Sequence, residues 1–69
     1  MAVDIGRTYS DEDFLAFGLI DTGERTTDRR LVRTPMNSAR IYKPTEDSRE
    51  RIVVEPRYDG FFISTKSSV

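Results

Sequence analysis

The side chains best suited to binding chemistry in this sequence are basic residues gathered in one segment. Residues 25–43 carry six basic side chains against a single acid, Asp28, whereas residues 1–24 carry six acids against a single base, Arg7. Planar guanidinium groups match the geometry of carboxylates and phosphates. Charges sorted in this way must meet within the fold, meet a second copy, or face outside partners. The basic residues of the segment are Arg25, Arg29, Arg30, Arg33, Arg40 and Lys43.

The composition excludes most catalytic templates. The chain has neither histidine nor cysteine, so Ser-His pairs, thiol nucleophiles and zinc sites of the usual composition are excluded. Its glycines stand too far apart for a phosphate-binding loop. The consecutive acids Asp11, Glu12 and Asp13 lack the loop geometry of a calcium site. We therefore predict a noncatalytic protein without metal or other cofactor.

One triplet carries a catalytic alternative. The stretch Leu19-Ile20-Asp21-Thr22-Gly23 resembles the apolar-apolar-Asp-Thr-Gly signature of retroviral-type aspartic proteases, in which two chains each supply one aspartate and the pair shares a proton. The resemblance covers five residues and implies that Asp21 would be the catalytic carboxylate of a dimer. The other interpretation of the triplet is a turn that leads out of a preceding helix.

A helix is predicted over residues 11–20. The Ser10 side chain can accept a hydrogen bond from an unpaired backbone N–H, and the three acids that follow suit the positive end of the helix dipole. Gly23 is a plausible stop. The apolar residues of this stretch surround the helix instead of forming one stripe, so a buried strand remains the alternative.

Two short strands are predicted within the basic segment, over residues 30–34 and 39–43, joined by a turn at residues 35–38. Each strand carries basic residues on faces that also hold apolar ones, so this hairpin is predicted to be partly exposed. The patch could contact phosphates, with Tyr42 stacking on bases. The interpretation we favour is pairing with the chain's own acids or with an acidic protein surface.

A second hairpin is predicted over residues 51–66 around an Asp59-Gly60 turn. Counting outward from this turn pairs Tyr58 with Phe61, Pro56 with Ile63 and Val54 with Thr65. The lack of an N–H on Pro56 leaves a longer loop and a shifted register open. The core face then comprises Ile52, Val54, Pro56, Tyr58, Phe61 and Ile63. On the opposite face Phe62 lies beside Arg57, either exposed to a partner or covered by another element.

The predicted fold is α+β, with one N-terminal helix packed on a three- or four-stranded antiparallel sheet, and the alternative is a small all-β barrel. We expect a single domain over residues 1–69 with loose ends at 1–3 and 67–69. A domain of this size buries only about 60% of its surface, and without disulfides or metal its remaining support is self-association or a partner. The longest apolar run is too short to span a membrane, no secretory signal is present, and we expect a cytoplasmic protein.

The predicted function is that of a small interaction module that binds a protein partner and modulates it, as an accessory regulator or inhibitor, for example from a phage or mobile element. A homodimer is one form of such contact. The alternative is a nucleic-acid-binding module that uses the basic hairpin over residues 29–43. The predicted partner-binding residues are Arg29, Arg30, Arg33, Arg40, Tyr42, Lys43, Arg57 and Phe62.

Overall fold

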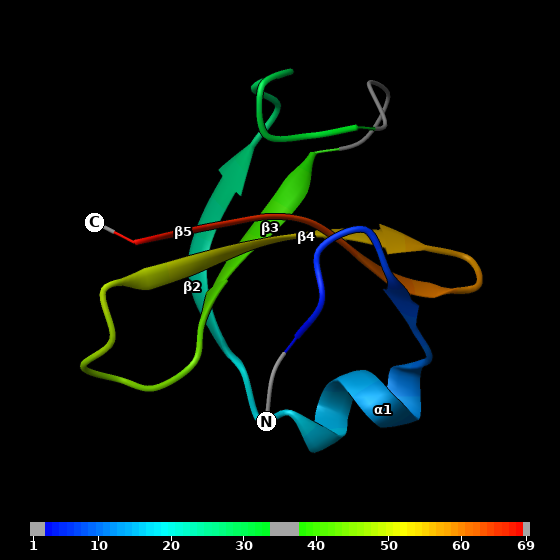
Figure 1. Cartoon of the computed structure of the whole chain (residues 1–69), viewed down its shortest axis with the longest axis horizontal. Coiled ribbons are helices and arrows are strands. Elements are labelled where there is room, and N and C mark those ends of the chain that lie inside the picture. The colour runs from blue at the N-terminus through cyan, green and yellow to red at the C-terminus, as the bar shows by residue number, and fades with distance from the viewer. Residues whose placement is uncertain (1–2, 34–37, 69) are drawn as a thin grey trace.

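The computed structural model describes residues 3–33 and 38–68. Within these residues one short helix accompanies five strands of an open antiparallel sheet (Figure 1). The α+β class is confirmed, whereas the predicted count of three or four strands is wrong, and the sheet is not a closed barrel. The strands lie in the order β1-β5-β4-β3-β2. The elements are β1 (Thr8–Tyr9), α1 (Asp11–Ala16), β2 (Ile20–Thr26), β3 (Ala39–Lys43), β4 (Glu50–Arg57) and β5 (Gly60–Ser68).

The helix begins as predicted but ends earlier. Ser10 caps α1, because its Oγ accepts a hydrogen bond from the backbone N–H of Asp13 at 3.2 Å. The chain leaves the helix at Gly18, which has a φ of +66°, a left-handed conformation that glycine adopts readily after a helix. Ile20 then starts β2. The predicted helix over 11–20 is therefore too long, and the strand alternative holds for its last residue.

The strand predicted over residues 30–34 is wrong for the residues that the structure describes. Asp28 instead nucleates a turn, because its backbone oxygen accepts from the N–H groups of Leu31 and Val32, both at 2.9 Å. The Asp28 carboxylate also accepts from the N–H of Arg30 at 2.9 Å. Such local bonds compete with strand pairing. The strand β3 has its predicted bounds but pairs with β2 and β4, and of the predicted turn over 35–38 only Ser38 lies within the described residues.

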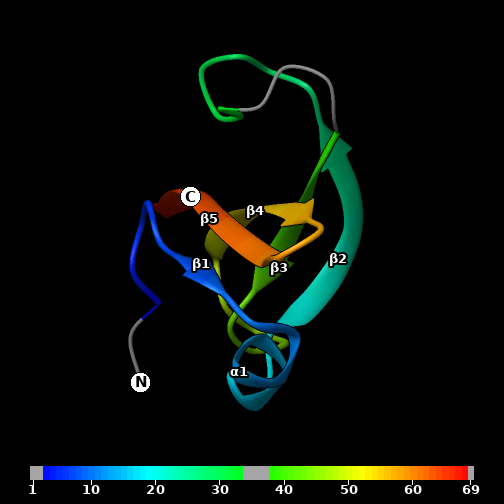
Figure 2. The same ribbon diagram turned by 90° about the vertical axis from the view of Figure 1, so that its right-hand side faces the viewer.

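Both faces of the sheet are covered. Figure 2 shows α1 below the strands and the segment of residues 27–33 above them. Because successive strand residues point to opposite faces, Val53 lies on the other face from Ile52 and Val54. It packs there with Ala39, Val32 and the partly buried Leu31. The larger cluster, on the α1 side, comprises Val3, Tyr9, Phe14, Tyr42, Ile52, Val54 and Ile63.

From the turn to Val54, the register of the β4–β5 hairpin differs from the predicted one by two residues, and beyond the irregularity between Val53 and Val54 it differs by one. Arg57 pairs with Gly60 and Pro56 pairs with Phe61, so the two turn residues are Tyr58 and Asp59. Opposed residues in an antiparallel pair alternate between hydrogen-bonded and non-hydrogen-bonded positions. The predicted register places Pro56 at a hydrogen-bonded position, which its missing N–H cannot serve. In the observed register Pro56 lies at a non-hydrogen-bonded position, next to the closing pair.

A shift of two residues leaves the faces of the hairpin unchanged. Ile52, Val54 and Ile63 are therefore buried as predicted, and Phe61 packs against the same cluster. Tyr58 is the error, because it lies in the turn and is fully exposed.

Both of the chain ends that were predicted to be loose have contacts in the described residues. Val3 is buried, and its backbone oxygen accepts a hydrogen bond from Lys66 Nζ at 3.1 Å. Ser67 and Ser68 pair with β4. Residues 1, 2 and 69 lie outside the described residues.

Gly60 sets the approach of β1 to the hairpin, and its substitution tests this packing. Its φ is +140°, and a Cβ at this position would clash with the backbone oxygen of Tyr9. We expect Gly60→Ala to lower the free energy of unfolding by roughly 2–4 kcal/mol, from backbone strain and overpacking together. Urea denaturation measures the change.

Gly18→Ala is the matched control. Gly18 also has a positive φ, but a Cβ added there would have no other atom within 4 Å, so only the backbone conformation is disfavoured, by about 1 kcal/mol. Equal losses for the two variants would contradict the close approach of β1 at Gly60.

Candidate functional site

The Asp21-Thr22-Gly23 triplet forms a bulge in β2. On one side of the bulge Asp21 pairs with Tyr42, and on the other Arg25 pairs with Arg40, with a shift of register between the two pairs. Gly23 has a φ of +84°. A bulge of this kind bends its strand and re-aims the side chains that follow it.

Side chains of the triplet satisfy the backbone groups that the bulge removes from the ladder. The N–H of Gly23 donates to Asp21 Oδ1 at 2.9 Å, and the N–H of Glu24 donates to Thr22 Oγ1 at 3.2 Å. The Thr22 hydroxyl in turn donates to the backbone oxygen of Ile41 at 2.7 Å. Each residue of the triplet thus has a structural role in the strand.

Asp21 is held in its ionised form. The hydrogen bond from the Gly23 N–H is the largest cause that lowers the pKa of Asp21 below its usual value, and the bond and charge of Arg25 lower the pKa further. Arg25 reaches the two carboxylate oxygens at 3.2 and 3.4 Å. A proton-sharing aspartate pair needs one carboxyl with a raised pKa, so the surroundings of Asp21 favour the structural role over the catalytic one.

Beyond the bulge, Arg25 and Arg40 flank a hollow of about 300 Å³ that is also lined by Ser38 and Pro56. The two arginines lie directly opposite each other in the β2–β3 pairing, so their side chains leave the same face. Arg25 is bonded to Asp21. The Arg40 side chain has no hydrogen-bond or ion-pair partner among the described residues, although its charge contributes to lowering the pKa of Asp21.

The predicted partner-binding residues lie in the 27–33 segment and on the strands β3, β4 and β5. Arg29, Arg30 and Arg33 are exposed on the 27–33 segment, whereas Arg40 and Lys43 are half-buried on β3. Arg30 pairs with Asp28 at 3.1 Å, and Lys43 pairs with Glu46 at 3.4 Å. Within the part of the chain that the structure describes, the side chains of Arg29 and Arg33 have no carboxylate partner.

The two aromatic residues expected to serve a partner are buried. Tyr42 packs edge-on against Phe14, with ring centroids 5.2 Å apart, and is not placed to stack on a base. Phe62 is only 8% exposed, because the guanidinium groups of Arg57 and Arg33 lie over its ring at 4.1 and 5.6 Å. Of the two alternatives for Phe62, the covered one is correct.

Sequence reasoning missed Glu55, a buried carboxylate that fastens the 27–33 segment to the sheet. Glu55 is 1% exposed, accepts a hydrogen bond from the Arg33 N–H at 2.7 Å and pairs with Arg57 at 3.5 Å. Thr65 adds a second tie, because its hydroxyl donates to the backbone oxygen of Leu31 at 2.9 Å. The available signal was an acid that interrupts the apolar run of β4.

The three acids of α1 and the arginines of the 27–33 segment lie at opposite ends of the molecule. Figures 1 and 2 both place α1, with its three acids, away from the 27–33 segment. Among the described residues, the predicted pairing between the acidic and basic blocks is limited to the neighbouring Asp21 and Arg25. The molecule measures 30 × 27 × 19 Å, whereas charges in physiological salt are screened over about 8 Å. The two ends therefore present separate fields to outside partners.

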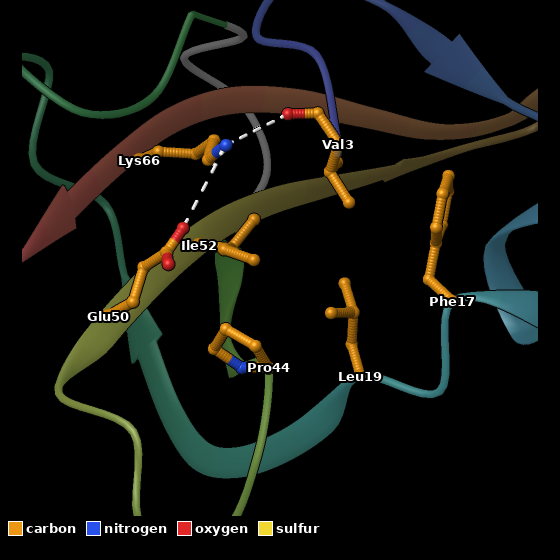
Figure 3. A pocket seen from close by; sticks show the side chains of 7 residues that line it. All are labelled: Val3, Phe17, Leu19, Pro44, Glu50, Ile52 and Lys66. Atoms are coloured by element: carbon orange, nitrogen blue, oxygen red, sulfur yellow. Dashed lines mark hydrogen bonds and ion pairs between the residues drawn. The ribbon is translucent and has the colours of Figure 1, made fainter. Parts of the chain in front are cut away.

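A second cavity, of about 270 Å³, lies on the α1 side of the sheet (Figure 3). Its walls are mainly apolar, and Lys66 crosses one side to reach the Val3 backbone oxygen and, at 3.8 Å, the Glu50 carboxylate. The Lys66 bonds tie the N-terminal segment to the sheet at this point. The lining residues are Val3, Phe17, Leu19, Pro44, Glu50, Ile52 and Lys66.

Comparisons of this chain with family models, with curated proteins and with solved structures give no match. In residues 3–33 and 38–68, α1 is far too short to cross a bilayer, and no other helix there has the required length and apolar character.

The lowered pKa of Asp21 predicts a pH-dependent contribution to stability. A carboxyl whose pKa is lower in the folded state stabilises that state above its unfolded pKa and loses this contribution as the pH falls through the folded value. We expect Asp21→Asn to lower the free energy of unfolding at pH 7 by less than about 1 kcal/mol, since the side chain is 40% exposed.

The difference between wild type and Asp21→Asn should shrink as the pH falls below the unfolded value of 3.8. Urea denaturation between pH 7 and pH 2.5 measures it. A difference that grows towards acid pH would contradict this account of Asp21.

The Glu55 tie predicts how the 27–33 segment opens. Glu55→Ala leaves the Arg33 N–H without this partner and removes the charge facing Arg57, so we expect a loss of roughly 3 kcal/mol in the free energy of unfolding. Hydrogen exchange should also become faster at the amides of Leu31, Val32 and Arg33.

Thr65→Val is the control, because it removes only the neutral tie to Leu31 and should cost about 1 kcal/mol. Unchanged exchange in the segment after Glu55→Ala would show that the carboxylate does not hold it.

Proposed function

We propose that this chain is a noncatalytic interaction module that binds a protein partner through its basic surface and modulates that partner. The basic surface is defined here as Arg29 and Arg33, which are exposed on the 27–33 segment. The observation that carries the proposal is that the side chains of Arg29 and Arg33 have no carboxylate partner among the described residues. An acidic surface on a partner would supply the missing carboxylates.

The way the segment is fastened supports this proposal. Val32 is buried in the second cluster, and Glu55 and Thr65 bond to the backbone beside it. The arginines of the segment are therefore presented on an ordered backbone. Binding through such a surface avoids much of the entropic cost of ordering a flexible loop.

The burial of the aromatic residues favours a protein over a nucleic acid. Single-stranded nucleic acids are bound through basic grooves combined with exposed rings on which bases stack. Tyr42 and Phe62, the rings nearest the basic residues in the sequence, are both buried, while the fully exposed Tyr58 lies in the β4–β5 turn. Nucleic-acid binding remains the alternative that the experiment below distinguishes.

A second copy of the chain is one partner with the acidic surface that this proposal requires, since α1 presents Asp11, Glu12 and Asp13.

The cytoplasm is the compartment we propose, because a chain without cysteine suits a reducing environment.

Charge reversal on the segment tests the proposed function. We expect Arg29→Glu/Arg33→Glu to weaken binding of the captured partner by about tenfold or more, because two attractive contacts become repulsive. Arg49→Glu is the matched control, since Arg49 is exposed, is equally basic and lies in the connection between β3 and β4.

The partner is captured from nuclease-treated lysate of the native host, purified, and titrated against each variant, with sedimentation of the chain alone reporting self-association. Binding that nuclease treatment abolishes would overturn the protein assignment in favour of nucleic acid. Equal weakening by the segment variant and the Arg49 control would overturn the assignment of the surface.

A further inference from the structure

We propose that the hollow between Arg25 and Arg40 is a binding site for a single carboxylate group. Its assignment to an acidic side chain of the partner rests on the proposed function. The hollow is lined by Arg25, Ser38, Arg40 and Pro56 and has a volume of about 300 Å³, which accommodates a carboxylate and the methylene groups that carry it.

The pairing of two arginines across the strands is the first argument. Arg25 and Arg40 are directly opposed in the β2–β3 ladder, and directly opposed residues have Cβ atoms about 4.5–5.5 Å apart. Like charges at this spacing destabilise a sheet. An anion between the two guanidinium groups turns this repulsion into two attractions.

The hydrogen-bond donors that remain free give the second argument. Arg25 uses three N–H groups, two towards Asp21 and one towards the backbone oxygen of Glu24. Since a guanidinium carries five N–H groups, Arg25 keeps two, and Arg40 keeps all five with respect to the described residues. Ser38 adds a hydroxyl at the wall of the hollow. Guanidinium groups bind carboxylate oxygens in pairs through such parallel donors.

The local charge identifies the anion. The two guanidinium groups carry two positive charges, and Asp21, whose pKa is lowered, supplies one negative charge against Arg25. A carboxylate with one negative charge neutralises the remainder. A phosphate group carries about −1.5 to −2 charges at pH 7 and would leave the site with excess negative charge.

The β2 bulge holds the site in register. Because the extra residues lie between Asp21 and Arg25, Asp21 and Arg25 remain on one face and bond each other along the strand at 3.2 Å. Arg25 is thereby held by Asp21 while it lines the hollow together with Arg40. Pro56 has no N–H and contributes only an apolar wall to the hollow.

Titration with sodium acetate, followed by backbone amide NMR of the full chain at constant ionic strength, tests this site. We expect saturable shifts at the amides of Arg25, Ser38 and Arg40. We expect Arg40→Gln to weaken acetate binding at least tenfold, whereas Arg30→Gln, which changes an exposed arginine paired with Asp28 outside the hollow, should leave it unchanged. Arg25→Gln provides a second variant should Arg40→Gln fail to fold.

Stability provides an independent readout. A single-site ligand at ten times its dissociation constant multiplies the folding equilibrium constant by about 11, so acetate should raise the thermal midpoint of wild type and not that of Arg40→Gln.

Three results would overturn the carboxylate site: shifts that chloride reproduces, acetate binding that survives both arginine variants, or inorganic phosphate binding more tightly than acetate. The outcome is separable from that of the proposed function. If acetate does not bind but Arg29→Glu/Arg33→Glu still weakens the partner, the site fails and the function stands. If acetate binds and the segment variant keeps its partner, the function fails and the site remains as a carboxylate site.

Discussion

The structure depends on one constraint, which is that the central β4–β5 hairpin carries apolar side chains on both of its faces. Ile52, Val54 and Ile63 need cover on one face, and Val53 needs it on the other. A chain of 69 residues has few elements to spare for two layers. A helix of six residues with the N-terminal segment covers one face, and an irregular loop covers the other.

The separation of charge follows because two different parts of the chain cover the two faces of the sheet. The N-terminal cover contains the capped helix, and three acids occupy its first turn, where they interact favourably with the helix dipole. The opposite cover is the 27–33 segment, which contributes Val32 to the core and leaves its arginines at the surface. Covering the two faces from separate parts of the chain therefore places the acids and the arginines at different ends of the molecule.

Predictions from the sequence were correct where interactions between neighbouring residues decide the local structure. The Ser10 cap, the bounds of β3 and the core face of the hairpin apart from Tyr58 were predicted, because each depends on neighbouring residues or on strand alternation. The helix end and the hairpin register were wrong, although Gly18 and Pro56 carried the relevant information. In each case a stronger turn signal decided the prediction. This signal was Gly23 for the helix end and Asp59-Gly60 for the hairpin register.

The candidate site was harder to predict because it depends on contacts between distant residues. The buried Glu55 is bonded by the backbone of Arg33, which lies 22 positions away in the sequence. The position of Arg25 opposite Arg40 depends on how many residues the bulge adds, which the Asp21-Thr22-Gly23 triplet does not specify by itself. The triplet resembled a catalytic signature because its residue types also suit a bulge, in which side chains replace ladder bonds.

The bulge has a further consequence because β2 is an edge strand of the open sheet. A long flat edge is a template onto which another chain can add a strand, and such edges lead to aggregation. The outer edge of β2 is interrupted by the turn at Gly23 and bordered by the charges of Asp21, Glu24 and Arg25. Sheet extension on this side is thereby opposed, so a protein that approaches β2 meets side chains instead of an unbroken row of backbone donors and acceptors.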